Sequence, residues 1–185
     1  MLNKTLAFID IETTGTNVSK HEIIEIGLVI AKPQDDGSYM IAKECEWKVQ
    51  PERIEDAEPA ALRVNGYDPA QWMFAHTLEQ AMQALAKEAD GAVMVAHNVG
   101  FDNSFIAKAF GDTGVENTMF YACLDTISLA VAKLQHNPRV KRYTLRSLCE
   151  LFNITNERAH TALADARATF EVYQRLMNPK KYFKN

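Results

Sequence analysis

The chain has 185 residues, 47% of them hydrophobic and 24% charged, and it carries a formal net charge of −4 at pH 7. This length and composition favour one globular domain with a sizeable core over two smaller domains. The acidic balance disfavours a protein that coats nucleic acid without specificity, because such proteins usually carry a basic face. It does not exclude an enzyme whose clustered carboxylates are offset locally by bound divalent cations.

No apolar run approaches the length needed to cross a bilayer, and the N-terminal segment lacks the apolar stretch and cleavage site of a signal peptide. We therefore expect a soluble, cytoplasmic protein without membrane contact. The three cysteines, Cys45, Cys123 and Cys149, are odd in number and are not paired at metal-ligand spacing. They are expected to be buried thiols in a reducing compartment.

The first part of the chain has the residue pattern of β-strands. Strands are expected over residues 6–12, 22–31 and 39–49, and the turn at 35–38 predicts an antiparallel meander. From about residue 56 the apolar residues recur at helical spacing. Helices are expected over 55–64, 77–90, 101–110, 126–135, 144–152 and 161–177, with further strands over 92–96 and 119–124.

A meander followed by strands separated by helices predicts an α/β fold, with a mixed sheet of about five strands flanked by helices. No repeat, linker or low-complexity tract interrupts the pattern. We therefore expect a single domain over residues 1–178 and a short basic tail over 179–185.

Asp10 and Glu12 stand at the end of the first predicted strand. Residues two apart on a strand project from the same face, where two carboxylates repel each other and are costly to desolvate. A divalent cation removes both penalties, and oxygen-only ligands favour Mg²⁺ or Mn²⁺. The spacing alone is weak evidence, because Asp56 and Glu58 repeat it at a polar, proline-flanked helix start that favours a structural role.

Asp102 follows the apolar strand expected at 92–96 and opens a helix, so it should lie near the end of the sheet. Taken alone, it fits equally well as a helix-start aspartate that only stabilises backbone N–H groups. Asp125, which precedes Thr126 at a strand-to-helix junction, is interpreted as an N-cap rather than as a further catalytic acid.

His160 and Asp165 are five residues apart, and on one helix they would point about 140° away from each other. They share a site only if Thr161 lies near the helix cap, with His160 on the preceding loop and Asp165 about one turn in. A loop histidine suits a general base because it can move relative to a metal. His97 also has an aspartate five residues on, but its place directly after a stiff strand favours a pocket-lining position.

Three segments together resemble the motifs of the DEDDh 3′–5′ exonuclease family, which includes the proofreading subunit of bacterial DNA polymerase III and ribonuclease T. They are FIDIETTG (8–15), HNVGFD (97–102) and HTALAD (160–165). Further segments resemble the family in the expected order, at residues 23–27, 62–68, 124–126 and 144–149. The resemblance covers nearly the whole chain, and it implies a ribonuclease-H-like fold.

The resemblance implies metal-dependent hydrolysis of phosphodiester bonds from the 3′ end of a single strand, with release of nucleoside 5′-monophosphates. Two divalent ions, Mg²⁺ or Mn²⁺, would stabilise the attacking and leaving oxygens. By carry-over, Asp10 bridges both ions, and Glu12 and Asp165 hold one of them. Asp102 supports the other ion, and His160 deprotonates the attacking water.

The resemblance also implies a set of substrate contacts. Thr13 and Thr14 would lie at the 3′-terminal nucleotide. Leu62, His97 and Phe101 would pack near its base or sugar, where stacking and apolar contact tolerate any base. For Leu62 and Phe101, a plain role in the core remains an alternative. DNA is favoured as the substrate and RNA stays open, because sugar discrimination depends on a few contacts to the 2′ position.

Some features depart from part of the family. Asn65 and Gly66 match the ribonuclease T side, whereas proofreading subunits more often have His-Gly, and Tyr67 stands where a smaller aliphatic residue is usual. The extended C-terminal segment that holds a polymerase is missing, so we expect a free-standing exonuclease and leave open whether it is a homodimer. The basic stretch over 139–142 fits either a phosphate contact or a solvated run.

Two rival functions predict different observations. A catalytically silent domain that binds nucleic acid or a protein would be expected to have lost one of the five catalytic residues, and all five are present. A small-molecule phosphohydrolase would share the metal site but would act on mononucleotides and lack an end-binding groove.

Overall fold

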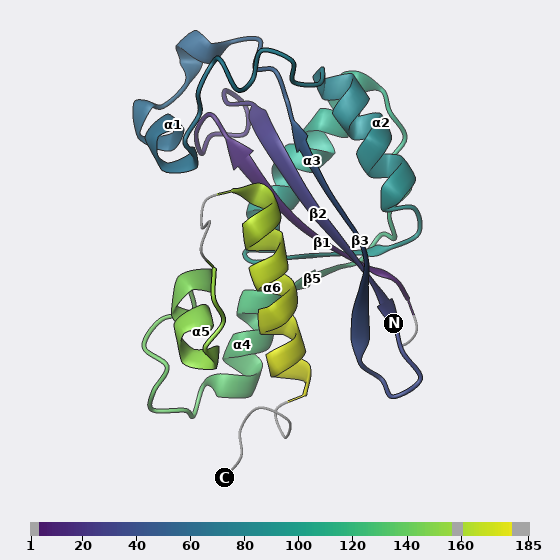
Figure 1. Ribbon diagram of the computed structural model, residues 1–185, viewed down its shortest axis with the longest axis vertical. Coiled ribbons are helices and arrows are strands. Elements are labelled where there is room, and N and C mark those ends of the chain that lie inside the picture. Colours follow the sequence, from purple (N-terminus) through teal and green to yellow (C-terminus); the bar gives the residue numbers. More distant parts are fainter. Residues whose placement is uncertain (1–3, 157–160, 179–185) are drawn as a thin grey trace.

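A computed structural model of the protein describes residues 4–156 and 161–178. Its centre is a five-stranded sheet with the order β3-β2-β1-β4-β5. The strands are β1 (Leu6–Thr13), β2 (Ile23–Pro33), β3 (Tyr39–Lys48), β4 (Val93–Ala96) and β5 (Cys123–Asp125). β1 and β3 pair antiparallel with β2, whereas β4 runs parallel to β1 and β5 parallel to β4. The predicted meander followed by strands separated by helices is confirmed (Figure 1).

The described part of the chain contains six α-helices. They are α1 (Pro59–Asn65), α2 (Leu78–Glu88), α3 (Val99–Thr113), α4 (Thr126–Leu134), α5 (Leu145–Phe152) and α6 (Ala162–Met177). The helix expected over 55–64 is divided, because a 3₁₀ turn (Ile54–Asp56) comes before α1. Pro59 explains the division, since proline lacks the N–H that a helix interior needs and suits the first helical turn. The strand expected over 119–124 is reduced to β5.

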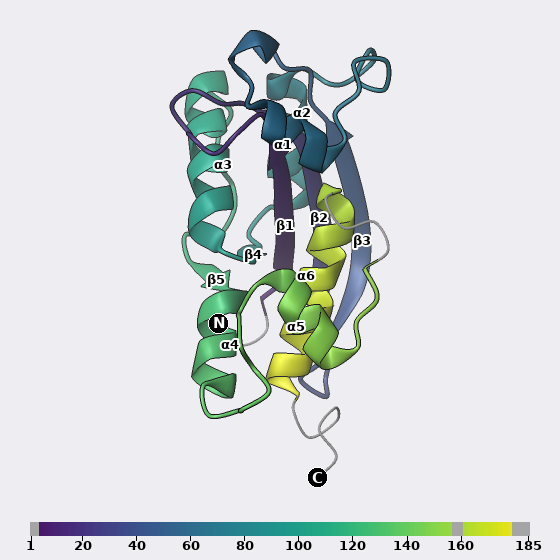
Figure 2. The same ribbon diagram turned by 90° about the vertical axis from the view of Figure 1, so that its left-hand side faces the viewer.

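The side chains of β1 alternate between two cores, which is the pattern of a central strand covered on both faces. Leu6 and Phe8 pack with α6, and the Phe8 ring meets that of Phe170 edge-on with centroids 5.3 Å apart. Ile9 and Ile11 face the other way and pack with α2 and α3. Figure 2 shows α3 and α6 on the two sides of β1.

The outer side of α6 contacts α4 and α5. Ala168 and Val172 of α6 share an apolar cluster with Ala130 of α4 and Leu148 of α5. Helix α6 is therefore packed between the sheet and a second helical layer.

The side chain of Asp125 caps α4, as predicted. It accepts hydrogen bonds from the N–H groups of Ile127 at 3.3 Å and Ser128 at 3.1 Å. It also accepts one from Asn98, directly before α3, at 3.0 Å. Burial raises the pKa of Asp125, but hydrogen bonds from the Ser128 hydroxyl and from these N–H groups outweigh it and hold the pKa below its usual range. The structural interpretation of this acid is confirmed.

The cysteines follow the prediction only in part. Cys149 is buried and Cys45 is partly buried, but Cys123 is exposed because it lies on β5 at the edge of the sheet. The expectation of three buried thiols is therefore wrong for Cys123. Within residues 4–156 and 161–178, no helix has both the length and the apolar character needed to cross a membrane.

Candidate active site

The alternation of β1 places Asp10 and Glu12 in the row of side chains that α6 covers. Both acids are partly buried. In the antiparallel pairing with β2, Asp10 lies opposite Gly27 and Glu12 lies opposite Glu25. The strand therefore brings two acids to the end of the sheet, on the face where α6 begins.

Asp165 reaches the same place from α6. Thr161 is the N-cap residue, and the Asp165 N–H donates to the Thr161 carbonyl at 3.1 Å, so Asp165 lies in the first turn. Oxygens of Asp10, Glu12 and Asp165 lie within 4.8 Å of one another. The predicted position of Asp165, one turn beyond the cap, is confirmed. His160 lies outside the described residues.

Asp102 approaches from the first turn of α3 and is almost fully buried. Its Oδ1 accepts a hydrogen bond from the Ile11 N–H at 3.2 Å. This N–H needs such a partner because the pairing of β1 with β4 extends only from Leu6 to Phe8. Asp102 thus accepts a hydrogen bond from the backbone N–H that lies between Asp10 and Glu12 on the strand. Its charge acts on Asp10, so it lies near the end of the sheet beside the clustered acids, as the sequence predicted.

The acids carry raised pKa values. Burial raises the pKa of Glu12 to about 8, with a further contribution from the charges of Asp165 and Glu25. Burial, followed by the charge of Asp102, also raises the pKa of Asp10 well above its usual range. Burial raises the pKa of Asp102 to about 7. Closely spaced acids that resist ionisation are the environment that a divalent cation stabilises, since its charge offsets both repulsion and lost hydration.

Thr13 is the last residue of β1 and Thr14 begins the following turn, and both are buried. The Thr13 hydroxyl donates to the Gly15 carbonyl at 2.7 Å, and the Thr14 hydroxyl accepts from the Glu22 N–H at 2.9 Å. Asn65 ties α1 to this turn by donating to the Thr13 carbonyl at 3.0 Å. The two threonine hydroxyls therefore shape the turn.

Leu62 and Phe101 are each half-buried, on α1 and α3 respectively. The Phe101 ring packs against Phe105, with centroids 5.1 Å apart, and against the core between the sheet and α3. The core role suggested for Phe101 is therefore present, although the residue is only half-buried. Their function as substrate contacts stays a prediction.

His97 is occupied by structural hydrogen bonds. Its Nδ1 lies 2.9 Å from the Thr126 hydroxyl, and its Nε2 lies 2.9 Å from the Tyr143 carbonyl oxygen. A carbonyl only accepts, so Nε2 carries the proton and donates it to Tyr143. Burial lowers the pKa of His97. With both ring nitrogens engaged, His97 does not fit the role of a general base and holds the segment before α5 against the end of β4.

Two residues near the acids were missed by the sequence analysis. Glu25 of β2 is 3% exposed, and Asn156 donates from Nδ2 to Oδ1 of Asp165 at 2.6 Å. An acid inside the apolar run Ile23–Gly27 was a usable signal for Glu25, because an ionisable side chain in a central strand needs a partner. No sequence pattern marked Asn156.

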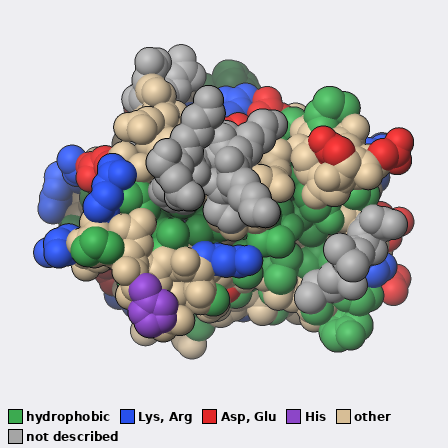
Figure 3. Space-filling view, turned by 90° about the horizontal axis from the view of Figure 1, so that it is seen from below, with side chains coloured by type: hydrophobic (Ala, Val, Ile, Leu, Met, Phe, Trp, Pro, Cys, Tyr) green, Lys and Arg blue, Asp and Glu red, His purple; other side chains and the backbone are tan. Residues whose placement is uncertain are grey.

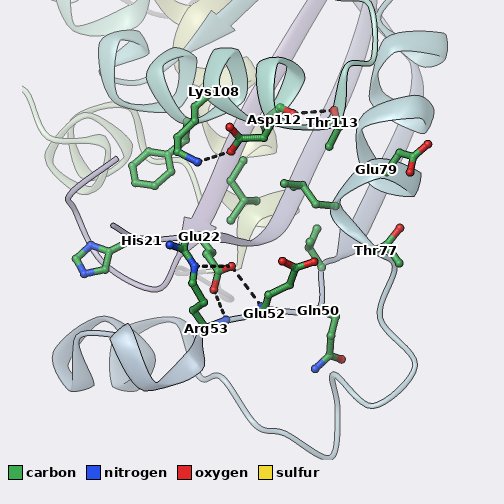
Figure 4. A pocket seen from close by; sticks show the side chains of 15 residues that line it. His21, Glu22, Gln50, Glu52, Arg53, Thr77, Glu79, Lys108, Asp112 and Thr113 are labelled. Carbon is green, nitrogen blue, oxygen red and sulfur yellow. Dashed lines mark hydrogen bonds and ion pairs between the residues drawn. The ribbon is translucent and has the colours of Figure 1, made fainter. Parts of the chain in front are cut away.

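A separate cavity of about 650 Å³ lies between α3, the start of α2 and the segment after β3, away from the acid cluster (Figure 4). Its cations already have acidic partners. The Arg53 Nε lies 3.6 Å from the Glu22 carboxylate, and Lys108 pairs with Asp112 one helical turn away. The cavity therefore offers no unpaired positive charge to an anionic substrate from these two side chains.

Comparison with known proteins agrees with the geometry. Residues 7–173 match the RNase_T family model, which describes exonucleases. The ribonuclease T of Shewanella frigidimarina is 29% identical over 184 residues, which is 92% of this chain and 80% of that protein. The ribonuclease T of Shewanella sp. strain W3-18-1 is 30% identical over the same shares of the two chains.

Among solved structures, E. coli exonuclease I in complex with a dT13 oligonucleotide superposes with a TM-score of 0.77 at 16% identity. The zinc-bound form of its complex with single-stranded DNA gives a TM-score of 0.79 at 16% identity. This chain is covered to 97% in both cases but spans only 42% and 41% of those chains. At this identity the likeness establishes the fold, and the expected ribonuclease-H-like architecture is confirmed. The family match, together with the convergence of the motif acids, shows that the chain belongs to the RNase_T exonuclease family, as a 3′–5′ exonuclease of the DEDD type.

Proposed function

We propose that the protein hydrolyses phosphodiester bonds at the 3′ end of single-stranded nucleic acid in a metal-dependent reaction that releases nucleoside 5′-monophosphates. The observation that carries this proposal is the convergence of Asp10, Glu12 and Asp165 within 4.8 Å, from strand and helix positions far apart in the sequence. Ribonuclease T relatives and exonuclease I bound to single-stranded DNA support the substrate class.

The acid set fits a hard divalent ion, because its ligand atoms are all carboxylate oxygens, and we propose two such ions, Mg²⁺ or Mn²⁺. Asp10 would bridge the ions, Glu12 and Asp165 would hold one, and Asp102 would support the other. When bound, such ions stabilise the attacking and leaving oxygens of an in-line displacement. The protein itself holds Asp102 through the hydrogen bond from the Ile11 N–H, which ties this acid to the strand that carries Asp10 and Glu12.

His160 is the proposed general base, which would take a proton from the attacking water. Two observations support it. The chain places Asp165 and the helix cap at Thr161 as this role requires, and the competing His97 has both ring nitrogens engaged. Residues five apart on one helix point about 140° away from each other. A base that precedes the helix cap is not subject to this constraint.

His160→Ala should lower kcat by about 10²–10⁴-fold, because a positioned general base contributes that much to the rate. Its affinity for Mn²⁺, measured by titration calorimetry, should not change. His136→Ala is the matched control, since His136 is exposed in the connection after α4 and should keep the wild-type rate. Loss of Mn²⁺ binding in His160→Ala would make this residue a ligand rather than a base.

The strand is proposed to enter past the turn at Thr13 and Thr14, with Leu62 and Phe101 at its last base. Exposed Lys and Arg side chains gather on the side of the molecule where the α4–α5 connection lies, at the left of Figure 3. Tyr143, at the end of that connection, is fixed to His97 by the 2.9 Å contact described above. This arrangement supports the phosphate-contact interpretation of the basic stretch 139–142.

The proposal is tested by digesting matched single-stranded DNA and RNA, each labelled at either end, with Mn²⁺ or with EDTA. With Mn²⁺ we expect immediate release of labelled mononucleotide from 3′-labelled strands and only late release from 5′-labelled strands. With EDTA we expect no release from either. Comparable hydrolysis of free mononucleotides would favour a phosphohydrolase. Binding of the strands without any cleavage would favour a silent binding domain.

A further inference from the structure

Glu25 is a buried carboxylate that the proposed chemistry does not use. It lies on β2 opposite Glu12, and only 3% of its surface is exposed. It is not one of the three acids whose oxygens lie within 4.8 Å of one another. A buried acid beside other acids is costly unless it makes a specific interaction, so its partner identifies its role.

The partner of Glu25 is the start of α6. Its Oε1 accepts a hydrogen bond from the backbone N–H of Ala162 at 2.8 Å, across 137 positions of sequence. Ala162 is the first residue of α6, and N–H groups in the first turn of a helix have no acceptor within the helix. A carboxylate at this end is also favoured by the helix dipole. Glu25 therefore caps α6 from a neighbouring strand.

Gly27 completes this contact. It lies two residues after Glu25 on the same face of β2, opposite Asp10. A Cβ at Gly27 would overlap the backbone of Ala162 and the N atom of Leu163. The first turn of α6 therefore rests directly on the backbone of β2, at a distance that only glycine permits.

We infer that Glu25 and Gly27 are positioning residues that fix the first turn of α6, and with it Asp165, against Asp10 and Glu12. The inference rests on the proposed function, in which Asp165 holds a metal ion. Because Gly27 pairs with Asp10 and Glu25 pairs with Glu12, each acid on β1 has its docking residue directly across the strand pair. The separation between the helix acid and the strand acids is thus set by β2.

Two substitutions separate the position of the Glu25 oxygen from its charge. Glu25→Gln keeps an oxygen at the same reach and removes the charge, whereas Glu25→Asp keeps the charge and shortens the side chain. If Glu25 acts by position, Glu25→Gln should bind Mn²⁺ with nearly wild-type affinity. Glu25→Asp should lose affinity by about tenfold or more, which is the usual cost of losing a group that orients a ligand. Titration calorimetry measures both.

Hydrogen exchange at the Ala162 amide provides a readout that needs neither metal nor substrate. The amide should stay protected in Glu25→Gln and exchange faster in Glu25→Asp. Gly27→Ala should also expose this amide and weaken Mn²⁺ binding, because the added methyl separates α6 from β2. Glu116→Gln and Glu116→Asp, at an exposed position after α3, are matched controls for charge and length and should behave as wild type.

A greater loss in Glu25→Gln than in Glu25→Asp would overturn the positioning role and assign the effect to charge. Equal effects of the two substitutions would also overturn it, because neither reach nor charge would then account for them. Failure of the proposed function looks different. A wild-type chain that binds no Mn²⁺ and cleaves no strand would contradict the metal-dependent reaction. In that case the exchange of the Ala162 amide would still decide whether Glu25 holds the helix.

Discussion

Asp10→Asn should reduce Mn²⁺-dependent release of mononucleotides from a 3′-labelled single strand by at least about 10³-fold, with the fold intact. The reason is that Asp10 shares a cluster with Glu12 and Asp165, in which it is proposed to hold metal ions. Asn has the size of Asp but lacks the negative charge that the proposed metal ligand would supply. Circular dichroism would show whether the fold is intact, and single-turnover digestion would measure the loss of rate.

The chain contains its own control for this experiment. Asp56 begins the second Asp-x-Glu pair but lies in the 3₁₀ turn before α1, outside the acid cluster. Asp56→Asn should therefore keep the wild-type rate. Full activity of Asp10→Asn, or of the wild type in EDTA, would refute the assignment of a metal-dependent reaction to this cluster.

In the absence of metal, the protein should lose stability as the pH rises from about 5 to about 8. The pKa of Glu12 is about 8 in the folded protein, above the value of about 4.3 for an unperturbed glutamate. Between these values the folded state holds more protons than the unfolded state, so raising the pH favours unfolding. Asp10 and Asp102, whose pKa values are also raised, act in the same direction.

Thermal unfolding at several pH values in EDTA tests this expectation. Glu12→Gln removes one of the acids and should raise the unfolding temperature of the metal-free protein at pH 8 by roughly 5 °C or more. Mn²⁺ should stabilise the wild type most at the same pH, because it binds the ionised acids of the folded state. Glu55→Gln, at an exposed position, is the control. A melting temperature that rises between pH 5 and 8 in EDTA would contradict the prediction.

The sequence predicted those parts of the molecule in which local pattern and tertiary position agree. The alternation of β1 determines which face Asp10 and Glu12 occupy, and the capping residues Thr161 and Asp125 mark where α6 and α4 begin. The five-residue interval between His160 and Asp165 placed the helix start correctly because helix geometry permits few alternatives.

The contacts that set the precision of the site were not predictable in this way. The hydrogen bond from the Ala162 N–H to Glu25 and the close approach of α6 to Gly27 both depend on how β2 and α6 cross, and these two elements are distant in sequence. Asn156, which reaches Asp165, precedes α6 without a local motif. Such contacts follow from register and packing, which residue spacing does not encode, and they determine how closely the acids can approach.

The placement of Asp165 on α6 makes the completion of the acid cluster depend on the order of folding. Asp10 and Glu12 come from the first strand, whereas Asp165 joins them only when α6 has docked on β2. A partly folded chain, or one still emerging during synthesis, has the sheet acids without the helix acid. In the proposed mechanism, strand cleavage therefore requires the completed fold, because a chain without the docked helix lacks one of the acids that would hold the metal.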